Sequence, residues 1–143
     1  MKKIFVTTLA VWTALSCSAQ KFYTKNGKID FDATSPSSPE RVEAVNRSVT
    51  CVIDTQNGAI QFAALIKGFE FERALMEEHF NENYLESEKF PKAEFRGEIK
   101  NNGEINYTRD GTYPVKVKGK LTMHGESDDI DAWSVSLLLL RGR

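Results

Sequence analysis

Two histidines are the side chains of this sequence that could most readily hold a metal ion or move a proton. His79 lies near Glu78 and Glu82 in a segment with helical spacing, which could form one corner of a metal site. The Glu-x-x-His order of helical carboxylate sites is absent, however, and no second helix of that kind is predicted. His124 precedes Gly125 at a predicted strand end, and a zinc site needs at least three protein ligands. We therefore expect a packed or hydrogen-bonded His79, a structural turn at His124, and no bound metal.

Nucleophilic chemistry has little support either. Cys51 lies between apolar alternates in residues 48–53, which is typical of a small buried side chain. No neighbouring histidine or cation is placed to activate the thiol. The sequence contains no Gly-x-Ser-x-Gly, no phosphate-binding glycine-rich loop and no His-Glu-x-x-His. We therefore assign no catalytic residue and no cofactor, and an enzyme or metalloprotein using His79 and His124 is kept only as a third hypothesis.

The pattern of charged side chains does not favour binding to a polyanion. Acidic pairs at 77–78 and 128–129 lie in hydrophilic surroundings, which is typical of solvated faces. Lysines at 116, 118 and 120 could meet anionic headgroups or a diphosphate, but their alternation with apolar residues favours the wet face of a strand. The chain has 19 basic and 20 acidic residues, a net charge of −1, so we expect no nucleic-acid partner.

The N-terminus has the pattern of a secretory signal. Lys2 and Lys3 are followed by a mostly apolar stretch and by small residues up to Ala19, so we expect residues 1–19 to be cleaved from a periplasmic or secreted protein. This apolar stretch is too short to span a bilayer stably. Cys17 offers an alternative, a lipidated cysteine, but a small alanine stands three positions before it, where a lipobox has a large aliphatic residue. Soluble export is therefore favoured over a lipoprotein.

Period-two alternation of apolar and polar residues predicts β-strands along most of the remaining chain. The clearest case is residues 115–123, where valine, leucine and methionine alternate with lysine and threonine. One buried face and one wet face are typical of antiparallel sheets. Similar alternation covers residues 29–33, 48–54, 60–66, 69–72, 94–99 and 105–107.

Turn signals and one helical segment separate these strands. Asn26-Gly27 is expected to divide the first two strands, and residues 34–40, with two prolines, predict a loop. Further glycine turns are expected at residues 56–58, 101–103 and 109–111. In residues 72–85 the apolar side chains fall at helical spacing, which predicts one helix with a single apolar face. These side chains are Leu75, Met76, Phe80 and Tyr84.

These elements predict an all-β protein with one short helix. The 143 residues and 41% hydrophobic content fit one globular domain, which we place at residues 20–143. Sequential antiparallel strands favour a closed or nearly closed barrel, or a sandwich. Aromatic residues are frequent at inward or helix-facing positions. A small barrel can fill itself with such side chains or hold one apolar ligand, and the residues alone leave both options open.

Three segments resemble the YceI-like family of exported bacterial proteins. They are residues 69–81, 87–97 and 119–127, and their most diagnostic stretches are Lys-Phe-Pro-Lys-Ala-Glu-Phe and Gly-Lys-Leu-Thr-Met-His-Gly. The resemblance implies an antiparallel lipocalin-like β-barrel with a helix near one end. It also implies a cavity that holds a long polyisoprenoid or a related amphiphilic lipid, for which no catalytic residues are needed.

The predicted ligand-binding residues share an apolar side chain at an inward or helix-facing position. They are Phe62, Phe69, Phe71, Leu75, Phe80, Phe90, Phe95, Val117 and Leu121. We expect their partner to be an isoprenoid-like or other amphiphilic lipid, and the oligomeric state stays open. The alternative is a structural or stress-related interaction protein whose barrel is filled by its own side chains.

The sequence departs from the family pattern near its C-terminus. Family members usually continue past the Gly-x-Leu-Thr-x-x-Gly stretch with further strands, whereas the tail at residues 131–143 offers one plausible strand and no hairpin. The resemblance therefore predicts a truncated or divergent C-terminus. It further predicts lower stability and weaker lipid binding than in a full-length relative.

Overall fold

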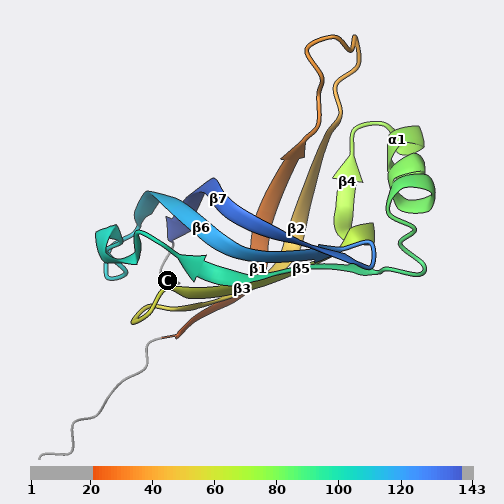
Figure 1. Ribbon diagram of the computed structural model, residues 1–143. Helices are drawn as coiled ribbons and strands as arrows, with labels where there is room; N and C mark the ends of the chain where they lie inside the picture. Colours follow the sequence, from red (N-terminus) through yellow and green to blue (C-terminus); the bar gives the residue numbers. More distant parts are fainter. Residues whose placement is uncertain (1–20, 140–143) are drawn as a thin grey trace, which may run out of the picture.

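The computed structural model describes residues 21–139, apart from the side chains of residues 132 and 133. The strands of this region (Figure 1) are β1 (Lys21–Asp32), β2 (Glu43–Asp54), β3 (Ala59–Leu65), β4 (Phe69–Phe71), β5 (Lys92–Ile99), β6 (Gly111–Met123) and β7 (Glu126–Leu139). Its helical elements are α1 (Ala74–His79), the π-helix η2 (Phe80–Tyr84) and the 3-10 turns η1 (Ile66–Gly68) and η3 (Asn102–Glu104). None of the helices in residues 21–139 has the length and apolar character that crossing a bilayer requires. The expected signal segment and Cys17 lie outside the described residues.

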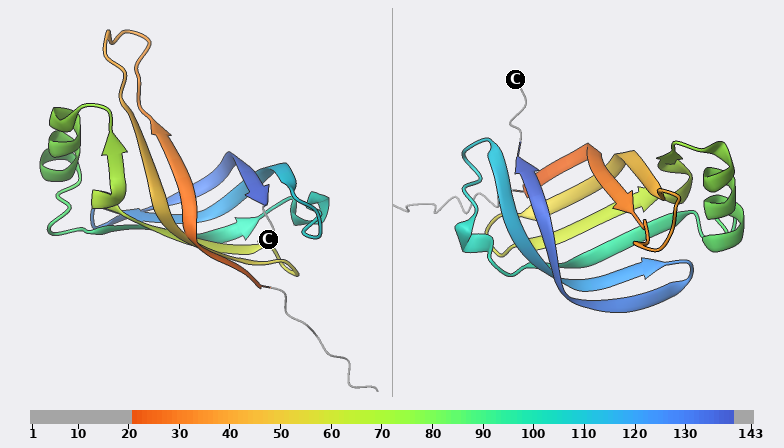
Figure 2. Two further views of the ribbon diagram at one scale, coloured as in Figure 1. Left: turned by 180° about the vertical axis from the view of Figure 1, so that it is seen from behind. Right: turned by 90° about the horizontal axis from the view of Figure 1, so that it is seen from above.

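The strands form a single antiparallel sheet, which confirms the all-β class with one short α-helix. Their order is β1-β2-β3-β5-β6-β7, and β4 pairs with β2 beside this path. The sheet curves strongly, so that one of its faces is concave (Figure 2). Within the described residues, β1 and β7 are the two ends of the strand order, so the sheet is a curved wall that stays open along this side.

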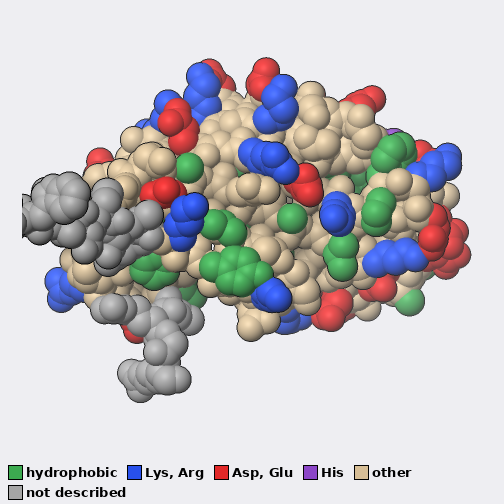
Figure 3. All heavy atoms as spheres, turned by 90° about the horizontal axis from the view of Figure 1, so that it is seen from below, with side chains coloured by type: hydrophobic (Ala, Val, Ile, Leu, Met, Phe, Trp, Pro, Cys, Tyr) green, Lys and Arg blue, Asp and Glu red, His purple; other side chains and the backbone are tan. Residues whose placement is uncertain are grey.

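Inward-facing apolar side chains form two packed clusters. The larger cluster surrounds Phe95, which is completely buried, and the smaller one surrounds Phe69. Phe62 contacts both clusters and joins them. The buried members of the larger cluster are Ile53, Ile60, Phe95, Ile99, Ile105, Val115, Val117 and Leu139. Charges of both signs are spread over the outer side of the sheet (Figure 3), as expected for a sheet with one wet face.

The long strand β2 changes partners halfway along its length. Its C-terminal half pairs with β3 from Thr50 to Ile53, and its N-terminal half pairs with β4 from Ala44 to Asn46. Asn46 lies where β2 passes from pairing with β4 to pairing with β3, and its side chain is completely buried. Its Nδ2 donates to the carbonyl oxygen of Leu65 (2.9 Å), and its Oδ1 accepts from the backbone N–H of Ser48 (2.9 Å). Asn46 thus supplies hydrogen bonds where the regular ladder is interrupted.

Strands β5 and β6 come close together at a pair of glycines. Gly97 and Gly119 are register partners. A Cβ atom on Gly119 would lie 2.3 Å from the carbonyl oxygen of Arg96 and 2.5 Å from the Cα of Gly97. A Cβ on Gly97 would lie 2.1 Å from the carbonyl oxygen of Lys118. Only glycine fits this crossing, where two backbones meet in the curved sheet.

The expected turn at Asn26-Gly27 is wrong, because both residues lie inside β1. The pairing of β1 with β2 shifts register on either side of Gly27, so this position is a bulge in one long strand. Gly27 is pressed against the neighbouring strand, since a Cβ there would lie 2.9 Å from the carbonyl oxygen of Val49. The predicted connections at 34–40 and 56–58 are confirmed between β1, β2 and β3.

The segment 105–107 is also not a strand, contrary to the alternation seen there. It belongs to the connection between β5 and β6, which holds the short turn η3. Ile105 is buried in the larger cluster, and Tyr107 packs against it. The Tyr107 hydroxyl donates to Oδ1 of Asn102 (2.7 Å), which secures the loop from inside. Apolar residues at alternate positions therefore mark a packed loop here.

The helix predicted at 72–85 forms in two parts, α1 and η2. Met76 and Phe80 are partly buried, whereas Leu75 is 61% exposed and Tyr84 is 72% exposed. Leu75 is turned by roughly 100° from Met76 around the helix axis, and here the side of Met76 faces the sheet while Leu75 faces solvent. The prediction of a single apolar face for all four residues is therefore wrong.

The C-terminal part of the described chain forms one strand, as expected. β7 pairs with β6 from Glu126 to Leu139, opposite Met123 back to Gly111. Leu139 is buried in the larger cluster. The register shifts once, between Val117 and Gly119, close to the glycine crossing.

Candidate functional site

Four phenylalanine rings meet at the end of the sheet that carries α1. We call Phe31, Phe69, Phe71 and Phe80 the aromatic cluster. The ring of Phe80 lies 4.9 Å from Phe71, 5.7 Å from Phe69 and 5.9 Å from Phe31, measured between centroids. These separations are favourable for aromatic pairs. Phe69 is buried and the other three rings are partly exposed, so the cluster is an apolar surface that solvent still reaches.

The strands position these rings through their pairing. Phe69 and Phe71 are alternate residues of β4 and therefore point to the same face. β4 pairs with β2, which places Phe71 opposite Ala44, and Phe31 of β1 lies opposite Ala44 on the other side. The small alanine lets rings from two strands come together. η2 brings Phe80 onto them from beyond the strand ends.

Four more of the predicted residues lie deeper in the sheet. Phe62 and Phe95 are register partners on β3 and β5, and their rings stack at 5.1 Å with an interplanar angle of 20°. Val117 is buried in the larger cluster, and Leu121 is partly buried against it. These side chains form the packed floor next to the aromatic cluster, and Phe62 connects the two.

The structure places the last two predicted residues apart from this group. Leu75 is 61% exposed on the outer side of α1. Phe90 packs edge-on against the ring of His124, at 5.0 Å between centroids, beside the turn between β6 and β7. The helical spacing did not tell which side of α1 faces the sheet, and Phe90 lies beyond the strand alternation that orients its neighbours.

Phe31 belongs to the aromatic cluster but is missing from the predicted residues. Its signal was present in the sequence, since Ile29, Phe31 and Ala33 alternate with Asp30 and Asp32. The pairing of β1 with β2 and of β2 with β4, which brings this ring to Phe69, is a long-range feature that alternation does not contain.

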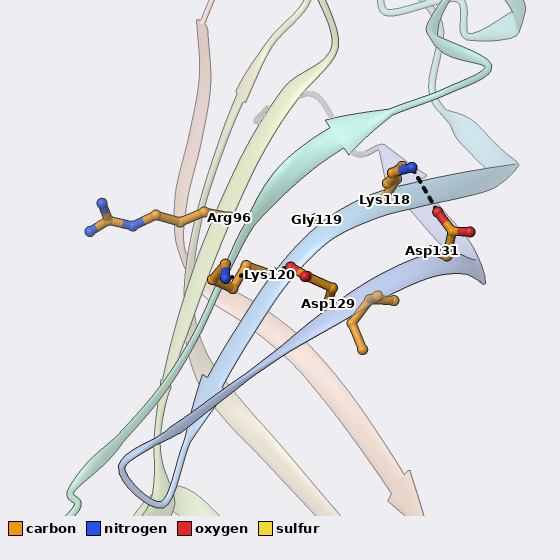
Figure 4. A pocket seen from close by; sticks show the side chains of 7 residues that line it. Arg96, Lys118, Gly119, Lys120, Asp129 and Asp131 are labelled. Atoms are coloured by element: carbon orange, nitrogen blue, oxygen red, sulfur yellow. Dashed lines mark ion pairs between the residues drawn. The ribbon is translucent and has the colours of Figure 1, made fainter.

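Two surface hollows lie outside the aromatic cluster, and most of the residues that line them are charged or polar. The larger, about 640 Å³, is on β5, β6 and β7 and is lined mainly by Arg96, Lys118, Lys120, Asp129 and Asp131. In Figure 4 the Arg96 side chain points away from the other charged groups. The second hollow, about 370 Å³, lies beside η2 and is lined by Asn81 and by residues 86–89, among others.

The lysine row is the wet face of β6, as predicted. Lys116, Lys118 and Lys120 are exposed. Lys118 pairs with Asp131 (2.7 Å) and Lys120 with Asp129 (3.5 Å), both on β7 (Figure 4). The hydrogen bond from Lys118 lowers the pKa of Asp131, and the same contact raises the pKa of Lys118. Such exposed pairs contribute little to stability.

The two histidines are far from a metal-binding arrangement. His79 is exposed on α1, and His124 lies in the turn between β6 and β7 with Nε2 2.8 Å from Oε2 of Glu86. Hydrogen bonds from Lys89 and then His124 lower the pKa of Glu86. Within the part of the chain that the structure describes, no three His, Cys, Asp or Glu side chains gather closely enough to hold a metal ion.

Cys51 faces inward on β2 and packs against the larger cluster, as a small apolar side chain does. Burial raises the pKa of its thiol to about 11, from an ordinary value of 9.0. The neutral thiol is therefore the favoured form in the folded protein. This contribution to stability is present below the ordinary pKa and is lost as the pH rises toward 11.

We expect alkylation of Cys51 at pH 8 to be about 100-fold slower in the folded protein than in urea, because its pKa differs by about two units and the thiolate is the reactive form. Peptide mapping by mass spectrometry after timed iodoacetamide treatment measures this ratio. Equal rates in the folded and unfolded protein would contradict the buried position of the thiol.

A curved antiparallel sheet with an apolar concave face and a short helix at one end is the class of fold that these observations define. The YceI-like domain model matches residues 6–134, so the chain belongs to this family. The family resemblance of the three sequence segments is thereby confirmed.

One solved structure shares this fold at low sequence identity, and a second one is similar at a lower score. A polyisoprenoid-binding domain from Saccharophagus degradans, implicated in plant cell wall breakdown, has a TM-score of 0.60 and 12% identity, covering 85% of this chain and 67% of its own. The Campylobacter jejuni YceI protein has a TM-score of 0.40 and 14% identity, covering 91% of this chain and 66% of its own. The chain thus spans about two thirds of the length of both relatives. The comparison with curated proteins gave no match.

Proposed function

We propose that this protein binds an isoprenoid-like or other amphiphilic lipid on its concave face and carries it without catalysis. The observation that carries the proposal is the aromatic cluster, in which three phenylalanine rings stay partly exposed at the end of a buried apolar floor. Membership of the YceI-like family supports it, as does the fold shared with the polyisoprenoid-binding domain of Saccharophagus degradans.

The physical chemistry of an isoprenoid chain suits such a surface. The chain is long, apolar and nearly free of polar groups, so its affinity has to come from apolar area removed from water, roughly 0.8 kcal/mol for each buried CH₂ group. Phenylalanine rings offer large apolar area without hydrogen-bonding demands. Phe31, Phe71 and Phe80 would contact the chain, and Phe62, Phe69, Phe95, Val117 and Leu121 would form the floor beneath it.

The setting of this carrier follows from the N-terminal sequence. We propose that residues 1–19 direct export and that residues 20–143 act as one lipid-binding domain in the periplasm or outside the cell. Isoprenoid lipids dissolve poorly in water, so a carrier in that compartment would shield the chain during transfer between membranes.

A binding titration with two matched variants tests the proposed face. Phe71→Ser removes a partly buried ring of the aromatic cluster, and Leu75→Ser removes an apolar side chain four residues later that faces solvent. We expect Phe71→Ser to weaken binding of a fluorescent polyprenyl alcohol at least tenfold, about 1.4 kcal/mol, and Leu75→Ser to leave it unchanged. Circular dichroism confirms that each variant is folded at the temperature used. Equal affinities of the wild-type protein and Phe71→Ser would contradict the proposed face.

A further inference from the structure

The turn between β6 and β7 begins with a histidine in the left-handed backbone conformation. His124 and Gly125 form a two-residue hairpin connection with φ values of 54° and 74°. Two successive positive φ angles are the pattern of a type I′ turn, in which asparagine is the preferred first residue. Among residues 21–139, His124 and Glu86 are the two non-glycine residues with positive φ. Histidine adopts this left-handed conformation more readily than most non-glycine residues, and in this turn its side chain also makes contacts outside the hairpin.

Those contacts join the turn to the segment that follows η2. Nε2 of His124 lies 2.8 Å from Oε2 of Glu86, and Nζ of Lys89 lies 2.6 Å from the other carboxylate oxygen. The pKa of Glu86 is lowered, so its carboxylate is ionised at neutral pH and His124 Nε2 donates the hydrogen bond. The ring of Phe90 packs edge-on against His124 at 5.0 Å. We call His124, Glu86 and Phe90 the clasp.

The clasp closes one end of the segment 72–91, which leaves the sheet after β4 and returns to it at β5. Within this fully described segment, α1 and η2 contain no buried residue, and Ser87 is buried in the part that returns to β5. Its first end is fixed near β4, where Oε2 of Glu77 accepts from the backbone N–H of Phe71 (3.2 Å). Between these two ends, Phe80 covers the rings of Phe31, Phe69 and Phe71. Figures 1 and 2 show the β6–β7 turn at the same end of the sheet as α1.

We infer that residues 72–91 form a lid over the aromatic cluster and that the clasp holds this lid closed. The helical part of this segment, α1 and η2, has no buried residue and therefore low local stability, so a few contacts decide whether it stays on the sheet. Release of the clasp lets Phe80 lift from the cluster while the contacts of Glu77 near β4 act as the hinge. The inference rests on the proposed function only for the identity of what the lid admits, a lipid chain.

The substitution His124→Asn separates the clasp from the turn. Asparagine suits the first position of a type I′ turn, so the hairpin should be kept, but its short side chain does not reproduce the contacts with Glu86 and Phe90. His79→Asn is the matched control, because the same change is made on the exposed face of α1 inside the lid. Glu86→Asn removes the clasp from the opposite side, at a left-handed position that asparagine also tolerates.

Hydrogen exchange without any lipid gives the primary readout. We expect amides of residues 80–90, beyond the hinge, to exchange at least tenfold faster in His124→Asn and in Glu86→Asn than in the wild type, with the β2, β3 and β5 amides unchanged and His79→Asn like the wild type. Unchanged exchange in the lid would overturn the inference. Faster exchange throughout the sheet would also overturn it, because the clasp would then stabilise the whole fold.

Uptake of a fluorescent polyprenyl alcohol gives the second readout. We expect His124→Asn to take up the probe at least threefold faster than the wild type, because the lid opens more often. An equal uptake rate, with faster lid exchange, would overturn the role of the lid as the entrance. Failure of every protein to bind the probe would remove the proposed function, while the exchange data still decide whether the lid exists.

Discussion

The substitution Gly119→Val is expected to unfold the protein or to lower its melting temperature by about 10 °C or more. A Cβ atom at Gly119 would lie 2.3 Å from the carbonyl oxygen of Arg96 and 2.5 Å from the Cα of Gly97, well inside van der Waals contact. Both are backbone atoms of the central strand β5, so no side chain can move to make room. Overpacking of this kind costs about 3 kcal/mol or more, a large part of the 5–15 kcal/mol that holds an ordinary domain folded.

Gly103→Ala is the matched control for this prediction. Gly103 lies in the turn η3, and nothing stands within 4 Å of the Cβ that alanine would add. We expect its melting temperature to match the wild type within a few degrees. Thermal denaturation followed by circular dichroism measures both variants. If Gly119→Val melted together with Gly103→Ala, the close crossing of β5 and β6 would be wrong.

Asn46→Ala is expected to have the second largest effect, a loss of about 2–3 kcal/mol in the free energy of unfolding. Asn46 is completely buried where β2 changes from β3 to β4. Alanine removes the hydrogen bonds to the Leu65 carbonyl and the Ser48 amide, both 2.9 Å, and leaves a void in their place. Losing the partners of groups near a buried position, together with the void, destabilises more than losing an exposed hydrogen bond.

Asn57→Ala isolates the part of this effect that comes from burial. Oδ1 of Asn57 accepts from the backbone N–H of Ala59 (2.9 Å), the same two-residue contact that Asn46 makes with Ser48, but in an exposed turn. We expect this variant to lose about 1 kcal/mol or less in urea denaturation. Similar losses in the free energy of unfolding for Asn46→Ala and Asn57→Ala would show that the burial of Asn46 does not add to its contribution to stability.

The alternation of the sequence predicted the strands because each strand has one inward and one wet face. Val115, Val117 and Leu121 point inward, and the lysines between them are exposed. The same rule failed at residues 105–107, because a loop that packs on the core also alternates. The turn signal at Asn26-Gly27 was wrong because a bulge and a turn use the same residues, and only the pairing with β2 tells them apart.

Strand alternation also predicted part of the candidate site, but not the residues whose position depends on how elements pack together. Phe69 and Phe71 follow from strand alternation together with the family resemblance, and their rings do meet Phe80. Leu75 was misplaced on the helix because spacing gives a stripe of residues but not the direction in which α1 faces the sheet. The contribution of Phe31 and the buried role of Asn46 depend on which strands pair, and a single sequence does not contain that information directly.

The most direct test of the proposed lipid-carrier function is native mass spectrometry of the protein purified from the exported fraction, followed by solvent extraction of the bound material. The account predicts a stoichiometric apolar adduct that extraction releases and that the extracted protein takes up again when a polyprenyl alcohol is supplied. A bare polypeptide that takes up no polyprenyl alcohol would contradict the account and would favour a sheet whose aromatic cluster only fills its own core.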